Sequence, residues 1–378
     1  MHSYSTEAAT KNTTLLYTEA SEALADESLA KGDLHEAVKM YEQILPSTSR
    51  SGIARARVLR KLGNCNISLW RFQQSARYFE EAIQILEACR TRNKAWWICW
   101  IDIQNDYCYI YHTTSQHDQL NSSINSLKKV IHQKGTKRQR IRFLTAVYYD
   151  AIQRCRWYMP PDEIIVLCEM IKQLAKEEKD IANEITALTC QALAHMWRKE
   201  GNDARSEAFR AQELLKQFHN DESLSLTYEI ITYSYRMDNN LETAHKWMQA
   251  AIAHERGTNN KQLQVLQTGM LAWFGVKKGD IEQAEILAKQ TLEYFTEVKF
   301  PFLFIALMPL IFIAISRNDI EKAAACAFLL LHPMAQRIPP SITTLLQQGL
   351  ALWGKRNLKD AKATFTVAVQ LAEKEGYF

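Results

Sequence analysis

The sequence is poor in residues that interrupt helices and lacks the motifs of common enzymes. Glycine and proline supply only 12 and 8 of the 378 residues, which leaves little room for long loops or disordered segments. The motifs G-x-x-x-x-G-K-[ST], H-E-x-x-H and G-x-S-x-G are absent, as is G-x-G-x-x-G after a strand. The sequence therefore gives no support for the common phosphate-binding and dinucleotide-binding folds, or for a zinc protease or serine hydrolase. We expect a chain without catalysis and without a cofactor.

The net charge and the spacing of the cysteines also give little support for binding to nucleic acid, a membrane or a metal ion. The 46 basic and 42 acidic residues leave a net charge of +4, which is small for this length. None of the eight cysteines forms a C-x-x-C pair, and most lie in apolar stretches, which predicts reduced, buried thiols in a cytoplasmic protein. The spacing of His112 and His117 does not place both on one helical face, so no metal site is expected.

Two segments bear on targeting. Residues 1–30 are rich in Ser, Thr, Glu and Ala without an apolar stretch, so we expect no secretory signal. Residues 300–316 are nearly all apolar, but they contain Pro301 and Pro309 and fall short of the about 20 residues that a membrane span needs. A helix buried on all sides has the same composition, so we expect no membrane span.

A regular cadence is the most informative feature present. A short polar turn is followed by a branched apolar or aromatic anchor residue and, three positions later, by a small residue. The last four anchors are separated by 40, 39 and 38 residues, a period typical of helical solenoids. The anchor and small residues are Leu34 with Ala37, Phe72 with Ser75, Leu241 with Ala244, Ile281 with Ala284, Ile320 with Ala323, and Leu358 with Ala361.

This cadence predicts an all-α, tetratricopeptide-like (TPR-like) solenoid of about nine helical hairpins, wound as a right-handed superhelix. We expect a single domain over residues 1–378, with regular repeats in 1–90 and 221–378. The middle, 91–220, is irregular, because anchors at Leu120, Ile164 and around Arg205 fall at intervals of 48, 44 and 41 residues. Stacked hairpins leave an extended groove rather than one catalytic pocket, so binding is the expected function.

A basic patch is the strongest local charge feature. Its seven cations enclose no acidic residue and could hold a phosphate backbone or an anionic ligand. The alternative is a solvated loop with lysines at helix ends. The basic patch consists of Lys128, Lys129, Lys134, Lys137, Arg138, Arg140 and Arg142.

A tryptophan-rich segment, 96–107, mixes indoles with polar groups. Its tryptophans either fill the core between repeats, with Asp102 and Gln104 bonded to neighbouring helices, or line the groove. In a helical-hairpin repeat, the first helices are expected to line the concave face. On that basis the predicted groove contacts are Asp102, Gln104, Tyr107, Arg142, Tyr149, Arg154 and Tyr233.

Several motifs in order along the chain resemble one known family. They are Trp100-Ile101-Asp102-Ile103-Gln104, Gly135-Thr136 with Gln139-Arg140 and Arg142-Phe143, Phe300-Pro301-Phe302 with Ala306-Leu307 and Pro309-Leu310, Leu330-Leu331-His332-Pro333 with Gln336-Arg337-Ile338-Pro339, and Leu371 to Tyr377. Together they resemble the C-terminal TPR-like region of large bacterial predicted signal-transduction ATPases of the STAND/AAA type, which carry attached regulator, kinase or cyclase domains.

This resemblance implies a helical region that senses a ligand or partner and restrains an ATPase. The sequence contains no ATPase module, so the chain is either a fragment of a longer protein or a stand-alone adaptor. We expect a non-catalytic scaffold or sensor of a bacterial signalling or transcription-regulatory system. Its partner would be a protein or peptide, including an ATPase or effector domain in cis or in trans, or a small effector. Two alternatives remain: a nucleic-acid-binding adaptor through the basic patch, and a receptor of the peptide-pheromone type.

Overall fold

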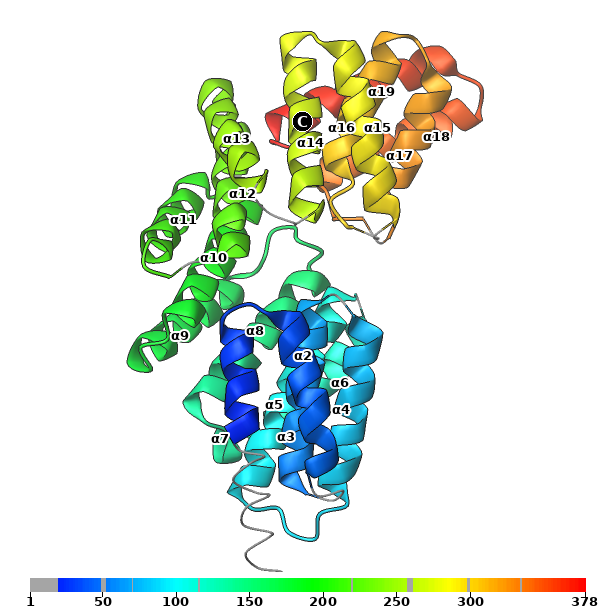
Figure 1. Cartoon of the computed structure of the whole chain (residues 1–378). Helices are drawn as coiled ribbons and strands as arrows, with labels where there is room; N and C mark the ends of the chain where they lie inside the picture. The colour runs from blue at the N-terminus through cyan, green and yellow to red at the C-terminus, as the bar shows by residue number, and fades with distance from the viewer. Residues whose placement is uncertain are drawn as a thin grey trace, which may run out of the picture. The chain divides into compact units, whose positions relative to one another are not determined.

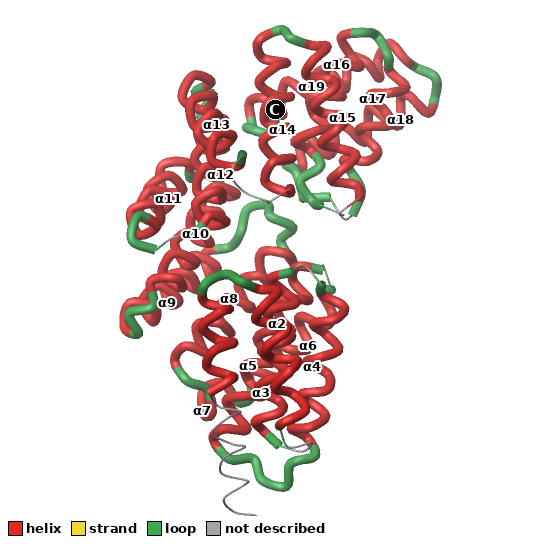
Figure 2. The backbone as a smooth tube through the Cα atoms, in the orientation of Figure 1, coloured by secondary structure: helices red, strands yellow, loops and turns green. Residues whose placement is uncertain are grey.

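The computed structural model describes residues 20–378 apart from 49–51, 70, 115, 219, 257–260, 298–299 and 334. Within these residues every regular element is a helix, and the chain divides into two compact units at Asp150/Ala151 (Figures 1 and 2). The boundary lies inside the segment with irregular anchor spacing. Of residues 1–30, in which we expect no secretory signal, residues 1–19 lie outside the described residues.

The N-terminal unit, up to Asp150, begins with helical backbone at residues 20–30. The helices that follow are α2 (Leu34–Ile44), the 3₁₀ turn η1 (Leu45–Ser47), α3 (Ile53–Ser68), α4 (Phe72–Glu87), α5 (Lys94–Thr113), α6 (His117–Lys128), α7 (Ile131–Lys134) and α8 (Lys137–Arg154). Helix α8 crosses the boundary, and its last turn belongs to the C-terminal unit.

The C-terminal unit, from Ala151, contains five consecutive hairpins after α9. Its helices are α9 (Asp162–Glu177), α10 (Ile181–Trp197), α11 (Gly201–Leu215), α12 (Asp221–Met237), α13 (Leu241–Glu255), α14 (Lys261–Lys278), α15 (Ile281–Glu297), α16 (Phe304–Ser316), α17 (Ile320–Leu330), α18 (Pro340–Gly354) and α19 (Leu358–Lys374). The even-numbered helices from α10 to α18 are the first helices of these hairpins, and the odd-numbered ones are the second helices.

The polar turns of the cadence end one helix and cap the next. Gly32 and Gly279 have φ values of 83° and 85°, in the left-handed region that glycine adopts without strain. The next residue, Asp33 or Asp280, accepts a hydrogen bond from a backbone N–H three positions later. Asn240, Asp319 and Asn357 cap α13, α17 and α19 in the same way. An Asx cap satisfies one of the free N–H groups at a helix start, which explains why the turn chemistry recurs.

The small residues of the cadence lie where the two helices of a hairpin meet. All six, Ala37, Ser75, Ala244, Ala284, Ala323 and Ala361, are fully buried. In the α14–α15 hairpin, a Cβ added to Gly275 would lie 3.2 Å from the Cβ of Ala284. Because neither helix presents a large side chain at the crossing, the two backbones approach closely. The sequence prediction of close hairpins is confirmed for the α14–α15 hairpin, and the full burial of the other five small residues agrees with it.

A second feature of the helix packing, a glycine that faces a phenylalanine ring, was not predicted from the sequence. Gly349 on α18 faces Phe365 on α19, and a Cβ at Gly349 would lie 2.5 Å from the Phe365 ring. Gly63 on α3 faces Phe79 on α4 in the same manner. Both phenylalanines are fully buried and follow their glycines by sixteen residues. The glycine thus makes room for an aromatic ring from the second helix.

The apolar segment 300–316 forms interior structure. Its helix, α16, has only 13 residues, and nearly all of them are buried in the main core cluster of the C-terminal unit. Over the described residues, no helix has the length and apolar character needed to cross a bilayer. The prediction of buried thiols is confirmed for six of the eight cysteines, and Cys89 and Cys155 are partly buried.

Replacing Gly349 with Ala should destabilise the protein by about 1–3 kcal/mol, because the added methyl group overlaps the ring of Phe365. The matched control is Gly354→Ala on the same helix, where nothing lies within 4 Å of the added Cβ. The control should leave stability unchanged or raise it by up to about 1 kcal/mol. Equal melting temperatures for the two variants would contradict the packing described.

Candidate functional site

Charged side chains connect α3, α5 and α8 of the N-terminal unit. Arg60 on α3 donates from Nη1 to Asp102 at 2.9 Å and from Nε to Asp106 at 2.6 Å, both on α5. Arg142 on α8 binds Asp106 from the other side. We call this set, together with Gln139, the polar seam. The polar seam contains two cations, Arg60 and Arg142, and two anions, Asp102 and Asp106, on three helices.

Most of the polar seam is partly accessible. The side chains of Arg60, Asp102 and Arg142 are 20%, 19% and 29% exposed, whereas Asp106 is only 4% exposed. Burial lowers the pKa of Arg60, but the charges of Asp106 and Asp102 outweigh burial, so its pKa lies above the ordinary value. Asp106 is therefore the buried centre of the ion-pair network, and the accessible groups around it are held in fixed positions.

Gln139 joins the seam to the start of α8. Its Nε2 donates to Asp102 at 2.9 Å and to the Ile98 carbonyl at 2.8 Å, while its Oε1 accepts from the Thr136 N–H at 3.0 Å. The Thr136 hydroxyl in turn accepts from the Gln139 N–H at 3.2 Å. This is a capping box, so one residue both starts the helix and positions a seam carboxylate.

The predicted groove contacts on α5 separate onto opposite faces. Asp102 lies in the polar seam, whereas Gln104 follows two residues later, about 200° around the helix. Gln104 and Tyr107 line a shallow pocket of 450 Å³ with residues of α4 and α6. The Tyr107 ring also packs on Phe79, with centroids 5.4 Å apart. One ligand on one face therefore does not contact all three residues.

The remaining predicted contacts differ in accessibility. Tyr149 stacks on His112 with ring centroids 3.9 Å apart. Arg154 is exposed at the end of α8. Tyr233 is only 5% exposed and lies in the main core cluster, so a partner reaches it only if its neighbours move.

The tryptophans of α5 belong to the core between repeats. Trp96 is 2% exposed, and its indole N–H donates to the Leu86 carbonyl at 2.6 Å. Trp96 and Trp100 stack with centroids 6.1 Å apart. The core interpretation is therefore confirmed for Trp96, and Trp97 and Trp100 are partly buried against the same cluster. The bonding of Asp102 to neighbouring helices is also confirmed, whereas Gln104 lines the pocket.

The basic patch is only partly available to a ligand. Lys128, Lys129, Lys134, Lys137 and Arg138 are exposed. Arg140 donates to the His132 carbonyl at 2.8 Å, and Arg142 belongs to the polar seam. Five cations of the patch are exposed around α6, α7 and the start of α8.

The C-terminal unit contains a buried arginine without a carboxylate partner. Arg236 on α12 is 2% exposed, and its Nε and Nη2 have no acceptor among the described residues. Its guanidinium lies 5.0 Å from the ring centroid of Tyr233 and 4.6 Å from that of Trp273. Burial lowers the pKa of Arg236. Aromatic faces stabilise the cation in part but do not replace hydrogen bonds, so this charge is under-satisfied.

About two helical turns before Arg236, Glu229 on α12 accepts a hydrogen bond from Gln267 on α14. Burial, together with the charge of Glu255, raises the pKa of Glu229 to about 8. The carboxyl group is therefore mostly protonated near neutral pH. Sequence reasoning missed both Glu229 and Arg236, because each looks like an ordinary polar residue of an amphipathic helix.

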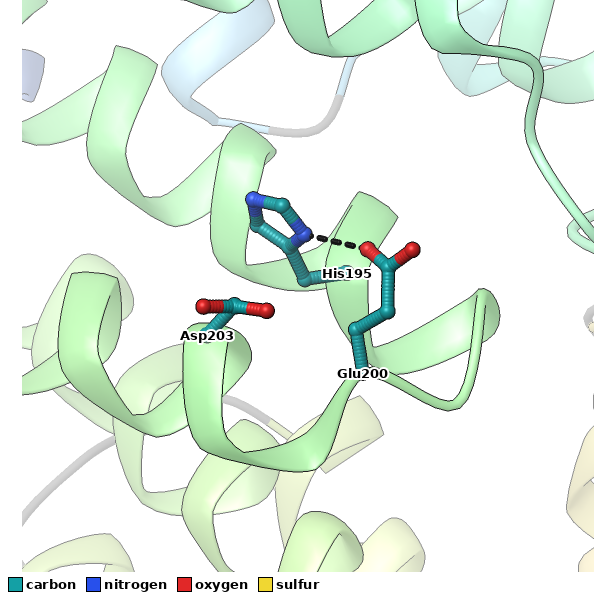
Figure 3. A group of neighbouring side chains, drawn as sticks. All are labelled: His195, Glu200 and Asp203. Atoms are coloured by element: carbon teal, nitrogen blue, oxygen red, sulfur yellow. Dashed lines mark hydrogen bonds and ion pairs between the residues drawn. The ribbon is translucent and has the colours of Figure 1, made fainter.

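His195, Glu200 and Asp203 are the group of described residues whose arrangement could suggest a metal site (Figure 3). The Nδ1 of His195 lies 2.6 Å from Glu200 Oε2, and Arg198 Nε lies 2.9 Å from Glu200 Oε1. Two ligand atoms that each lie about 2.0–2.2 Å from a tetrahedral zinc ion are farther apart than these two atoms of His195 and Glu200. The positive guanidinium of Arg198 would also repel a metal ion at this position. The trio is better explained as a hydrogen-bonded turn between α10 and α11.

Comparison with known proteins supports the fold. No family model matches the chain, and no curated protein matches it. The structure is similar to a Rap protein complexed with competence and sporulation factor, with a TM-score of 0.65, 9% identity, and coverage of 95% of this chain and 98% of the other. It is also similar to the apo form of the quorum sensor NprR from B. thuringiensis, with a TM-score of 0.54, 15% identity, and coverage of 84% of this chain and 94% of the other.

A third similar structure is a STAND protein with a tetratricopeptide repeat sensor, PH0952 from Pyrococcus horikoshii. The TM-score is 0.51 at 16% identity, over 74% of this chain and 42% of that one. These identities establish the fold alone: the chain is an all-α helical-repeat protein of the TPR type. Its origin as the C-terminal region of such an ATPase stays a prediction.

Replacing Asp106 with Asn should destabilise the protein by roughly 3–5 kcal/mol, because it leaves Arg60 and Arg142 without their buried counter-charge. Denaturant unfolding measures the change. The control is Glu87→Gln on exposed surface, with an expected change within about 0.5 kcal/mol. A variant at Asp106 as stable as the control would contradict the buried network.

The raised pKa of Glu229 predicts a loss of stability with rising pH. The folded state holds this proton more tightly than the unfolded state, so the contribution is complete below the ordinary pKa of 4.5 and is lost as the pH rises to about 8. Glu229→Gln should remove that part of the pH dependence and raise the melting temperature at pH 9. Exposed Glu242→Gln is the control. An unchanged pH profile for Glu229→Gln would refute the assignment.

Proposed function

We propose that this chain is a non-catalytic binding scaffold or sensor of a signalling or transcription-regulatory system. The observation that carries the proposal is the polar seam, in which α3, α5 and α8 hold partly exposed charges in fixed positions. A segment of a protein or peptide lying along these helices would meet both a cation and an anion within one turn of α5. Such a surface recognises a partner through several repeats and needs no catalytic group.

The similar structures support this choice of class. One is a Rap protein in a complex with competence and sporulation factor, one is a quorum sensor, and one carries a tetratricopeptide repeat sensor. A receptor of the peptide-pheromone type is a specific form of the same proposal. An ATPase or effector domain, in cis or in trans, is the partner that the family resemblance implies.

The mechanism would be a shift between conformations. Each hairpin contacts only its neighbours, so small changes between hairpins accumulate along a solenoid. A ligand that bridges several first helices favours the curvature in which all its contacts form. Its differential affinity for the two curvatures sets how far a bound effector moves.

The experiment is capture of partners from an extract of the source cells at two salt concentrations, with mass spectrometry of the bound proteins. Three baits are compared: the native chain, the double variant Arg60→Ala with Asp102→Ala, and Gln104→Ala on the opposite face of α5. The double variant removes one cation and one anion and leaves Asp106 paired with Arg142. Circular dichroism confirms that all baits are folded.

The proposal predicts a protein that the native bait and Gln104→Ala retain at high salt and that the double variant loses. Equal retention by all three folded baits would contradict a role for the polar seam. Recovery of nucleic acid alone, released by salt with a slope of about −0.9 per phosphate, would favour the alternative function through the five exposed cations of the basic patch. Lys134→Glu with Lys137→Glu would then abolish binding.

A further inference from the structure

The last residues of the C-terminal unit fold back onto its first helices. Helix α19 ends at Lys374, and Gly376, with φ 77°, turns the chain. Figure 1 shows this segment, coloured red, beside α14. Tyr377 and Phe378 are 5% and 4% exposed, although they lie beyond the last helix. We call Glu373–Phe378 the tail.

Two lysines from different repeats each hold one carboxylate and one ring of the tail. Lys277 on α14 pairs with Glu373 at 2.5 Å and lies 4.4 Å from the Phe378 ring centroid. Lys199, in the turn after α10, pairs with Glu375 and lies 5.9 Å from the Tyr377 ring centroid. The contacts join residues 96 and 176 positions apart in the sequence.

The rings of the tail occupy an aromatic surface on α16. Tyr377 packs on Phe304 with centroids 5.2 Å apart, and Phe378 packs on Phe312 at 5.4 Å. On α12, Met237 approaches Gly376 so closely that an added Cβ would lie 2.8 Å from its Cγ. The tail therefore contacts α12, α14 and α16, the first helices of three consecutive hairpins.

These contacts lie on the side of the first helices that faces away from the second helices. On α14, Gly275 faces Ala284 of α15, and Lys277 follows about 200° around the helix. Met237 and Lys277 both precede the small residue of their hairpin by seven positions, so they are equivalent in the repeat. The tail thus lies across the outer sides of several first helices, where a bound segment would also contact more than one repeat.

The tail does not satisfy every group beside it. Tyr233 packs on Phe304, the ring that also contacts Tyr377, and the Arg236 guanidinium lies 5.0 Å from Tyr233. Two nitrogens of Arg236 have no acceptor among the described residues, and the Tyr233 hydroxyl has none either. A ligand that brought a further carboxylate to this position would gain hydrogen bonds that the tail lacks.

We propose that the tail is an internal ligand that occupies a docking surface on α12, α14 and α16, and that a partner segment carrying carboxylates and aromatic side chains displaces it. The inference rests on the proposed binding function and names the chemistry of the segment at a second surface. The tail itself defines that chemistry: two carboxylates at alternate positions, then two aromatic residues. Release of the tail would couple partner binding to a change in the segment that follows α19.

The test measures binding of a fluorescein-labelled peptide with the sequence of Ala372–Phe378 by fluorescence anisotropy. In the native chain the tethered tail competes at a high effective concentration, so binding should be weak. The full-length variant Tyr377→Ala with Phe378→Ala should bind the peptide at least about ten-fold more tightly. Adding Lys199→Ala and Lys277→Ala should abolish this gain, whereas the neighbouring Lys278→Ala should preserve it.

A second variant, Glu373→Lys with Glu375→Lys, weakens the tail through charge and keeps its rings. It should also bind the peptide more tightly than the native chain does. Folded variants that bind the peptide no better than the native chain would overturn the proposal. If neither variant melts cooperatively, the tail is a fixed part of the core and the proposal fails. A concentration-dependent dimer that exchanges tails would overturn occupancy within one chain. In each case partner capture through the polar seam would stand unaffected.

Discussion

The close approach of the two helices within each hairpin is the constraint on which the rest of the structure depends. It requires a small residue where the backbones cross, as at Ala284 and Gly275, or a glycine that receives a ring, as at Gly349 and Phe365. A hairpin packed in this way buries one side of each helix but leaves the outer side of the first helix available. Stacking of the hairpins then aligns these outer sides from repeat to repeat.

The two compact units use their first helices differently. In the N-terminal unit, charges meet charges, and the polar seam offers a partly exposed alternation of cation and anion around Asp106. In the C-terminal unit, the equivalent surface is aromatic and cationic, and Tyr377 and Phe378 cover it. In the proposed scaffold, one surface stays partly exposed and the tail covers another, so that one partner would bind continuously and a second one only after the tail is displaced.

Sequence reasoning recovered the elements set by local chemistry. Asp280 and Asp319 predict helix starts, and Ala244 and Ala361 predict where two helices cross. Each of these residues interacts with neighbours that are close in the sequence. The pairing of Asp102 with Arg60, 42 residues earlier, depends on the rotation of α5, which no local signal specifies. For that reason Gln104 and Tyr107 were grouped with Asp102, although they face the other way. The contact between Lys199 and Glu375 and the burial of Arg236 arise from the path of the whole solenoid, and the sequence pattern contains no signal for either.

Native-state hydrogen exchange of the unmodified chain tests most directly the proposal that the tail opens while the hairpins stay folded. The amides of Tyr377 and Phe378 donate to the Ala372 carbonyl at 2.8 and 3.1 Å, so they are protected while the tail is bound. The account predicts that these amides exchange at least about a hundred-fold faster than those in the middle of α16, through local opening that leaves the hairpins folded. Exchange of the tail and α16 at the same rate, with the same dependence on denaturant, would show that the tail opens only when the whole unit unfolds and would contradict the account.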